Sequence, residues 1–108
     1  MPNEVEWLVQ IWDKPGVLKL RFQHVAEHMA YHQPYRNSGL LVFSGPTLKN
    51  QPIAGSGLEV TGSVLVFRLD GDETEVEKIL QNDPLALAGV WDLDNASITP
   101  FKLFAPPE

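Results

Sequence analysis

Residues 17–35 read VLKLRFQHVAEHMAYHQPY and contain all three histidines of the chain, His24, His28 and His32. The histidines recur at every fourth position. Because a helix turns by about 100° per residue, this spacing lines them along one side of a predicted helix. Arg21 falls on the same side. A helix that only packs against a core does not need such a row of titratable groups, so this side is the first candidate for a functional site.

An apolar stripe runs beside the histidines. Leu18, Phe22, Val25 and Met29 follow the spacing of a helix that faces a core, and we expect this stripe to be the buried face. Pro34 is expected to end the regular helix just before it, because proline disfavours helical backbone in the preceding residue.

The composition places the chain among ordinary globular domains. Its 108 residues suffice for one domain with a single core, and 44% hydrophobic and 20% charged residues argue against disorder. The absence of cysteine excludes disulfides, thiolate nucleophiles and sulfur ligands for metals. A net charge of −6, with the basic residues scattered singly, argues against nucleic acid as a partner.

No segment predicts membrane insertion or export. The longest aliphatic or aromatic runs cover residues 40–43 and 64–67, which is the length of a strand and far too short to cross a bilayer. The first residues, MPNEVE, contain neither a basic nor an apolar leader. We therefore expect a cytoplasmic protein that has no membrane partner.

Apolar alternation and turn residues predict the order β-α-β-β-α-β, which is an α+β ferredoxin-like sandwich: a four-stranded antiparallel sheet with its helices on one face. A single domain is expected over 1–108, with a core at about 5–104 and a frayed tail at 105–108. The expected strands cover residues 5–12, 40–43, 62–69 and part of 90–103, with a bulge near 95–96 and an edge position at Pro100; a loop covers 49–61, a helix follows Asp72, and one further turn covers 85–89.

The second face of the predicted sheet has no helix to cover it. Trp7 and Trp12 lie on opposite faces of the first strand, so both faces carry large apolar side chains. We therefore hypothesise that the chain forms a homodimer in which a second copy covers the open face.

A set of short motifs spans nearly the whole chain in a fixed order. Through them the sequence resembles the YCII-related family of the dimeric α/β-barrel superfamily. The landmarks are WDKPG at 12–16, the Arg21 and His28 pair, GLLVFSGP at 39–46, GS at 62–63, NDP at 82–84, AGV at 88–90 and PFK at 100–102. The sequence departs from the family pattern at Val25-Ala26, where Arg-Pro is usual, and at Leu85, where an aromatic residue is frequent.

The resemblance implies a site centred on a histidine and an aspartate. The family histidine corresponds to His28, and the aspartates correspond to Asp83 and Asp13. Relatives include a dehydrochlorinase acting on a chlorinated hydroxyquinol, and the superfamily includes muconolactone isomerases. We expect general acid/base chemistry, an elimination or isomerisation, on a small cyclic or aromatic molecule, with either aspartate orienting His28. Neither reaction needs a cofactor, and the sequence has no cofactor motif.

The substrate is expected to contact four residues besides the acid/base pair. Arg21 would hold an anionic oxygen, and the SGP segment would contribute a hydroxyl group and backbone from Ser44, Gly45 and Pro46. The loop at 49–61 would close over the site, because a long glycine-containing loop in a small domain is often functional.

Simpler interpretations exist for each candidate. Asp83 before Pro84 is a typical helix N-cap, and Asp13 is a usual turn residue. Three histidines along a straight helix span about 12 Å at 1.5 Å per residue, too far to share one ion, so no metal site is expected. His24 and His32 match no family position and are expected to face solvent. The alternative function is a non-catalytic module that binds a metabolite or dimerises.

Overall fold

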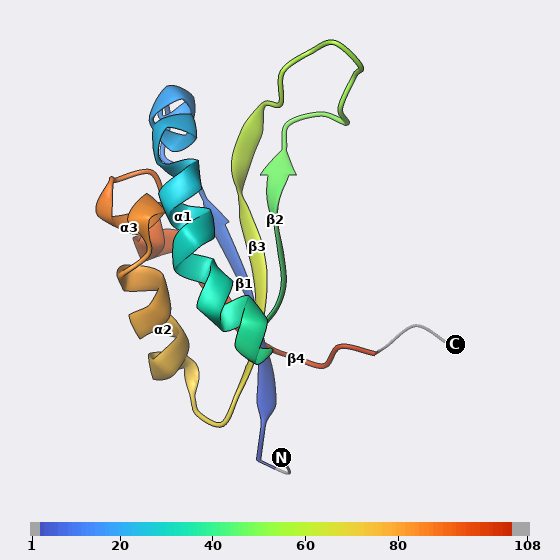
Figure 1. The fold of residues 1–108 in the computed structure, drawn as a ribbon, viewed down its shortest axis with the longest axis vertical. Helices are drawn as coiled ribbons and strands as arrows, with labels where there is room; N and C mark the ends of the chain where they lie inside the picture. The colour runs from blue at the N-terminus through green and yellow to red at the C-terminus, as the bar shows by residue number, and fades with distance from the viewer. Residues whose placement is uncertain (1–2, 105–108) are drawn as a thin grey trace.

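The computed structural model describes residues 3–104 and confirms the α+β ferredoxin-like fold. The sheet order is β2-β3-β1-β4 with every pairing antiparallel, and α1, α2 and α3 lie on one side of the sheet (Figure 1). The predicted tail at 105–108 lies outside the described residues. The elements are β1 (Val5–Trp12), α1 (Leu18–Ser38), β2 (Leu41–Leu48), β3 (Val60–Leu69), α2 (Glu73–Gln81), α3 (Pro84–Leu87), the short 3₁₀ helix η1 (Leu93–Asn95) and β4 (Ser97–Phe101).

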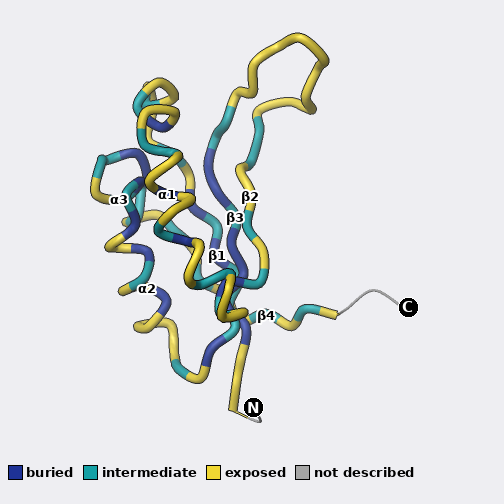
Figure 2. The backbone as a smooth tube through the Cα atoms, viewed as in Figure 1, coloured by how far each residue is buried: buried dark blue, intermediate teal, exposed yellow. Residues whose placement is uncertain are grey.

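The core fills the space between the helices and the sheet, where dark blue buried segments follow β1 and β3 (Figure 2). The alternation of β1 sends Val9 and Ile11 into this core. Behind them, α2 and α3 bring Val76, Leu80 and Leu85, all buried. Asp72 caps α2 as predicted, because its side chain accepts a hydrogen bond from the Thr74 N–H at 2.9 Å.

Helix α1 is rotated relative to the prediction. Its apolar stripe is largely exposed: Leu18, Phe22 and Met29 keep 38%, 52% and 47% of their surface accessible. The buried residues of α1 are instead Arg21, His28 and His32. The expectation of an apolar buried face was therefore wrong. Buried polar groups need hydrogen-bond partners, and Arg21, His28 and His32 each have at least one.

Helix α1 also runs through Pro34, which was expected to end it, and stops at Ser38. Proline near the end of a helix removes one backbone hydrogen bond without unravelling the last turn. That turn is closed by Gly39, whose φ of 81° is the left-handed conformation typical of a C-cap. The extra residues carry Arg36 onto the face beside β2, where its side chain contacts Ser44.

Strand β2 is longer than predicted. It continues through Ser44, Gly45 and Pro46 to Leu48 instead of ending at residue 43. Pro46 is tolerated because β2 is an edge strand. Strand β3 begins at Val60, so the loop covers residues 49–59.

At the opposite edge of the sheet, Pro100 lies in β4 as expected. The irregularity predicted near residues 95–96 is η1, which precedes that strand.

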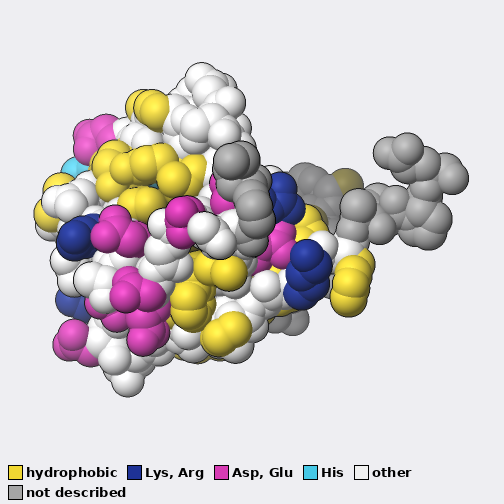
Figure 3. All heavy atoms as spheres, turned by 90° about the horizontal axis from the view of Figure 1, so that it is seen from below, with side chains coloured by type: hydrophobic (Ala, Val, Ile, Leu, Met, Phe, Trp, Pro, Cys, Tyr) yellow, Lys and Arg dark blue, Asp and Glu magenta, His cyan; other side chains and the backbone are white. Residues whose placement is uncertain are grey.

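The surface reflects the acidic composition. Seen from the end where α2 begins, acidic side chains gather on the side of the helices (Figure 3). Helix α2 alone exposes Glu73, Glu75 and Glu77. Within residues 3–104 no helix is both long and apolar enough to cross a membrane.

Candidate active site

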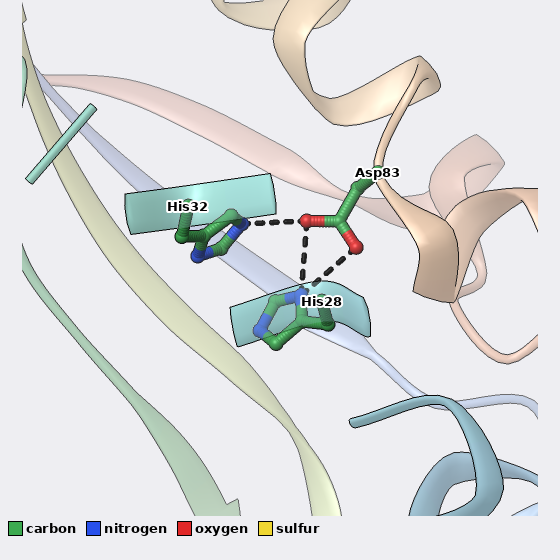
Figure 4. Close-up of side chains that lie close together, drawn as sticks. All are labelled: His28, His32 and Asp83. Carbon is green, nitrogen blue, oxygen red and sulfur yellow. Dashed lines mark hydrogen bonds and ion pairs between the residues drawn. The ribbon is translucent and has the colours of Figure 1, made fainter. Parts of the chain in front are cut away.

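Two histidines of α1 converge on one carboxylate (Figure 4). His28 Nδ1 lies 2.8 and 2.9 Å from the two oxygens of Asp83, and His32 Nε2 lies 2.5 Å from Oδ2. The two histidines are four residues apart and lie on adjacent turns of the same helix side. Asp83 approaches them from the segment between α2 and α3. The candidate site is therefore built by α1 together with the start of α3.

Asp83 is held by its own local structure. It is the N-cap of α3, with Pro84 at the first helical position, and its Oδ1 accepts a hydrogen bond from the Leu85 N–H at 2.8 Å. The predicted cap is confirmed, and the same carboxylate also receives both histidines. Burial acts to raise the pKa of Asp83, but hydrogen bonds from His28, His32 and the Leu85 N–H outweigh it and leave the pKa below its ordinary value.

The two nitrogens of His28 have different surroundings. Nδ1 lies on Asp83, and Nε2 has no hydrogen-bond partner among the described residues. Nε2 remains accessible to solvent. The ring borders a cavity and lies nearly perpendicular to the Trp91 ring, with a centroid distance of 5.5 Å. His28 can therefore exchange a proton through Nε2 while Nδ1–H stays on the carboxylate.

His32 is a site residue that the sequence analysis missed. It was expected to face solvent but is only 1% exposed, because Asp83 offers it a buried acceptor. Its Nδ1 is buried and has no partner within the described chain. Burying an unpaired N–H at Nδ1 would cost more free energy than burying an unpaired lone pair. The geometry therefore assigns the ring proton to Nε2, which donates it to Asp83. The spacing from His28 was the signal that could have identified it. His24, in contrast, is partly exposed, 3.4 Å from Glu27.

Asp13 pairs with Arg21 and not with His28. Arg21 Nη1 donates to both Asp13 oxygens at 2.8 and 3.0 Å, and Nη2 donates to Ser63 Oγ at 2.9 Å. Burial raises the pKa of Asp13, and Arg21 opposes that effect without cancelling it. Trp91 Nε1 also donates to Ser63 Oγ at 3.2 Å. Arg21 borders the cavity, but its Nη groups already bond to protein acceptors.

A cavity of about 250 Å³ lies between α1 and the sheet. Its walls are mostly apolar, and Val25, the position of one family departure, is among them. Leu85, the other departure, is buried in the core instead. Ser44, Gly45 and Pro46 all lie on the cavity wall, as does Arg36, which the sequence analysis did not single out. The lining residues are Arg21, Phe22, Val25, His28, Met29, Arg36, Ser44, Gly45, Pro46, Leu58, Val60, Ser63 and Leu65.

His28, His32 and Asp83 are also of the residue types that bind zinc, and their ligand atoms lie within 4.8 Å of one another. The sequence argument against a metal considered only the helix, whereas the carboxylate comes from a distant segment. The contacts of 2.8 and 2.5 Å are nevertheless those of direct hydrogen bonds. We therefore describe the three side chains as a hydrogen-bonded trio, and the absence of a metal remains a prediction.

Comparison with known sequences gives the class of protein. Residues 5–102 match the sequence model of the YCII-related domain. The chain belongs to this family, within the dimeric α/β-barrel superfamily.

Three relatives span nearly the whole chain. The chain is 38% identical over 101 residues to the xenovulene A biosynthesis cluster protein asL2 of Sarocladium schorii, covering 91% of this chain and 88% of that protein. It is 33% identical over 97 residues to fusaric acid biosynthesis protein 2 of Gibberella fujikuroi, covering 90% and 92%. A similar solved structure is the 5-chloro-2-hydroxyhydroquinone dehydrochlorinase of Burkholderia phenoliruptrix in complex with 2,5-dihydroxybenzoquinone, with TM-score 0.73, 30% identity and coverage of 90% and 93%.

The lowered pKa of Asp83 predicts a specific pH dependence of stability. The contribution of this carboxylate is complete above its unfolded pKa of about 3.9 and is lost as pH falls through the lower native value. Asp83→Asn should lower the free energy of unfolding by about 3 kcal/mol at pH 7, because it breaks a buried charged network. The difference from wild type should shrink below pH about 4. Urea unfolding at several pH values measures it, with the exposed Asp94→Asn as control. An equal difference at pH 3 and pH 7 would contradict the assignment.

Proposed function

We propose that the protein catalyses general acid/base chemistry, an elimination or isomerisation, on a small cyclic or aromatic molecule. His28 is the proton carrier and Asp83 orients it. The observation that carries the proposal is the division of the His28 ring, which borders an apolar cavity: Nδ1 lies on a buried carboxylate, and Nε2 has no hydrogen-bond partner among the described residues. The relatives support it, since one is named a dehydrochlorinase and others are named for biosynthesis clusters.

The chemistry follows from the two ends of the imidazole ring. Nε2 takes a proton from the substrate, and the resulting imidazolium is balanced by Asp83 at 2.8 Å from Nδ1. In an elimination, the electron pair of the broken bond to hydrogen forms a new π bond and a leaving group departs as an anion. In an isomerisation, the same nitrogen returns the proton to another substrate atom. Both reactions use only side chains of this chain.

The cavity walls suit such a substrate. Phe22, Val25 and Met29 of α1 form one side, and Leu58 and Val60 at the end of the 49–59 loop contribute to the rim. Apolar walls bind a ring and exclude water, which strengthens the electrostatic contacts of His28. We propose that the loop closes over bound substrate. Asp13 then acts indirectly, by holding Arg21 against the sheet beneath the site.

Replacing His28 tests the proposal directly. His28→Gln should lower turnover by about 10²–10⁴-fold, because general acid/base catalysis is lost, while binding of a ring ligand persists. Chloride release from 5-chloro-2-hydroxyhydroquinone and exchange of ring hydrogens of 2,5-dihydroxybenzoquinone in D₂O report proton transfer with and without a leaving group. His24→Gln is the matched control on the same helix. A wild-type protein that binds the quinone but catalyses neither process would favour the non-catalytic binding module.

His32 should act on turnover through Asp83. It does not line the cavity, so His32→Leu should lower kcat by about tenfold and leave KM unchanged, because Asp83 loses one of its N–H donors. His32→Gln offers an amide N–H in place of the ring and should recover part of the loss. Steady-state kinetics on the same substrates measures the effect. Equal losses in the two variants, or a change confined to KM, would assign His32 a purely structural role.

We also propose that the protein is a homodimer joined through the open sheet face. Leu8, Gln10 and Trp12 share the face of β1 opposite its core residues, and Trp12 remains 50% exposed. On β2, Phe43 remains 40% exposed. Helices cover only the other face (Figure 1). The membership of the chain in the dimeric α/β-barrel superfamily supports this arrangement.

A charge on the open face should dissociate the dimer. Trp12→Glu should convert the protein from dimer to monomer at micromolar concentration, because the new carboxylate would be buried without a partner. Sedimentation velocity measures the change. The control Ile53→Glu removes an apolar side chain that is 70% exposed on the 49–59 loop. A stable wild-type monomer at micromolar concentration would contradict the proposal.

A further inference from the structure

The cavity contains an arginine that has no acidic partner. Arg36 Nη2 donates to the Ser44 hydroxyl, and Arg36 Nε is buried without any partner within the described residues. Residues 3–104 provide no carboxylate that forms an ion pair with Arg36. An arginine side chain stays charged at any working pH. A positive charge is therefore left without a counterion beside an apolar cavity, in a protein of net charge −6.

The other cavity arginine differs in this respect. Arg21 forms a bidentate pair with Asp13 and also donates to Ser63, so its charge is already balanced. The role of anion holder that the sequence suggested for Arg21 is better filled by Arg36. A basic residue in the last turn of a helix can also serve the helix dipole. Here, however, the guanidinium bonds to Ser44 on β2 and lines the cavity.

The position of Arg36 relative to His28 limits the ligand. They are eight residues apart on α1, a rise of about 12 Å. Helical side chains lean toward the N-terminus, so the long side chain of Arg36 reaches back toward His28 and shortens this separation. Arg36 and His28 line the same cavity, whose volume of about 250 Å³ is of the size that a single-ring ligand needs. Phe22 and Met29 of α1 provide apolar contacts along the way.

We propose that Arg36, together with Ser44, forms an anion-binding subsite that selects ring substrates carrying an acidic oxygen, a phenolate, enolate or carboxylate. The guanidinium holds this oxygen and sets the ring so that a different atom of it faces His28 Nε2. This inference rests on the proposed function, because it defines the substrate class of the same cavity. Arg36 is thus a specificity-determining residue, and His28 remains the proton carrier.

A matched pair of ligands tests the subsite without any turnover. 2,5-Dihydroxybenzoquinone has acidic oxygens, and 2,5-dimethoxybenzoquinone has the same ring without them. Calorimetry should show that Arg36→Gln weakens binding of the dihydroxy compound by about tenfold and leaves the dimethoxy compound within about twofold, because only the first loses a charge-assisted hydrogen bond. Arg36→Lys keeps the charge and should fall between. Lys78→Gln removes one charge from exposed α2 and should change neither affinity.

A second probe covers the case in which the quinones bind poorly. Benzoate is a minimal ring with an acidic oxygen, and its titration should shift the Arg36 Nε–H signal in ¹H–¹⁵N spectra. The subsite is wrong if Arg36→Gln loses no discrimination between the two quinones, or if neither benzoate nor the dihydroxy compound perturbs Arg36. Failure of the proposed function is distinct, because it appears as unchanged turnover in His28→Gln while the discrimination by Arg36 persists.

Discussion

The arrangement of this molecule depends on one buried carboxylate. Asp83 has no exposed surface, and a charge removed from water is tolerated only when hydrogen-bond donors surround it. Its donors come from two places, the Leu85 N–H of its own helix and the two histidines of α1. Helix α1 must therefore turn its histidine side inward, although this leaves its apolar stripe largely exposed. The rotation of α1, the burial of His32 and the exposure of Phe22 all follow from this constraint.

A second polar network holds His28 from another direction. Asp13 fixes Arg21, Arg21 bonds to Ser63, and Ser63 accepts the indole N–H of Trp91. The ring of Trp91 contacts the His28 ring at nearly a right angle. His28 is thus held at Nδ1 by a carboxylate and at its ring by a buried aromatic side chain. In the proposed mechanism, these two contacts would keep His28 in one orientation, so that little reorganisation is needed during the reaction.

Local signals predicted most of the fold. Asp83 before Pro84 indicated a cap, a helix was expected after Asp72, and the order of elements predicted the sheet. The predicted ends of α1 and β2 were wrong because proline usually interrupts a helix or a strand, but its position in the fold can make it acceptable. Pro34 is tolerated in the last turns of α1, and Pro46 is tolerated on an edge strand.

The pairing of His28 with Asp83 agrees with the sequence analysis, whereas the errors about His32 and about the buried side of α1 have a different cause. A helical wheel gives the angles between side chains, but it cannot tell which side faces inward when the partner lies far away in the sequence. Asp83 is 55 residues from His28 and 51 from His32, so no spacing rule connects them. The same limit explains the two arginines. The sequence did not show that Asp13 is the partner of Arg21. Nor did it show that Arg36 bonds to Ser44 and forms no ion pair within residues 3–104.

These observations imply that α1 contributes to stability in an unusual way. The apolar core lies mainly between the sheet and α2, α3 and the segment around Trp91, whereas α1 buries two histidines and an arginine. Its attachment therefore combines the apolar contacts of Leu20 and Tyr35 with charged hydrogen bonds, whose strength changes with protonation. Replacing His28 or His32 with leucine would supply apolar surface but leave the Asp83 charge with one donor fewer. If His28 is the proton carrier that we propose, α1 shows the conflict between stability and activity that is common at functional sites, because the position of the imidazole depends on a pH-dependent attachment.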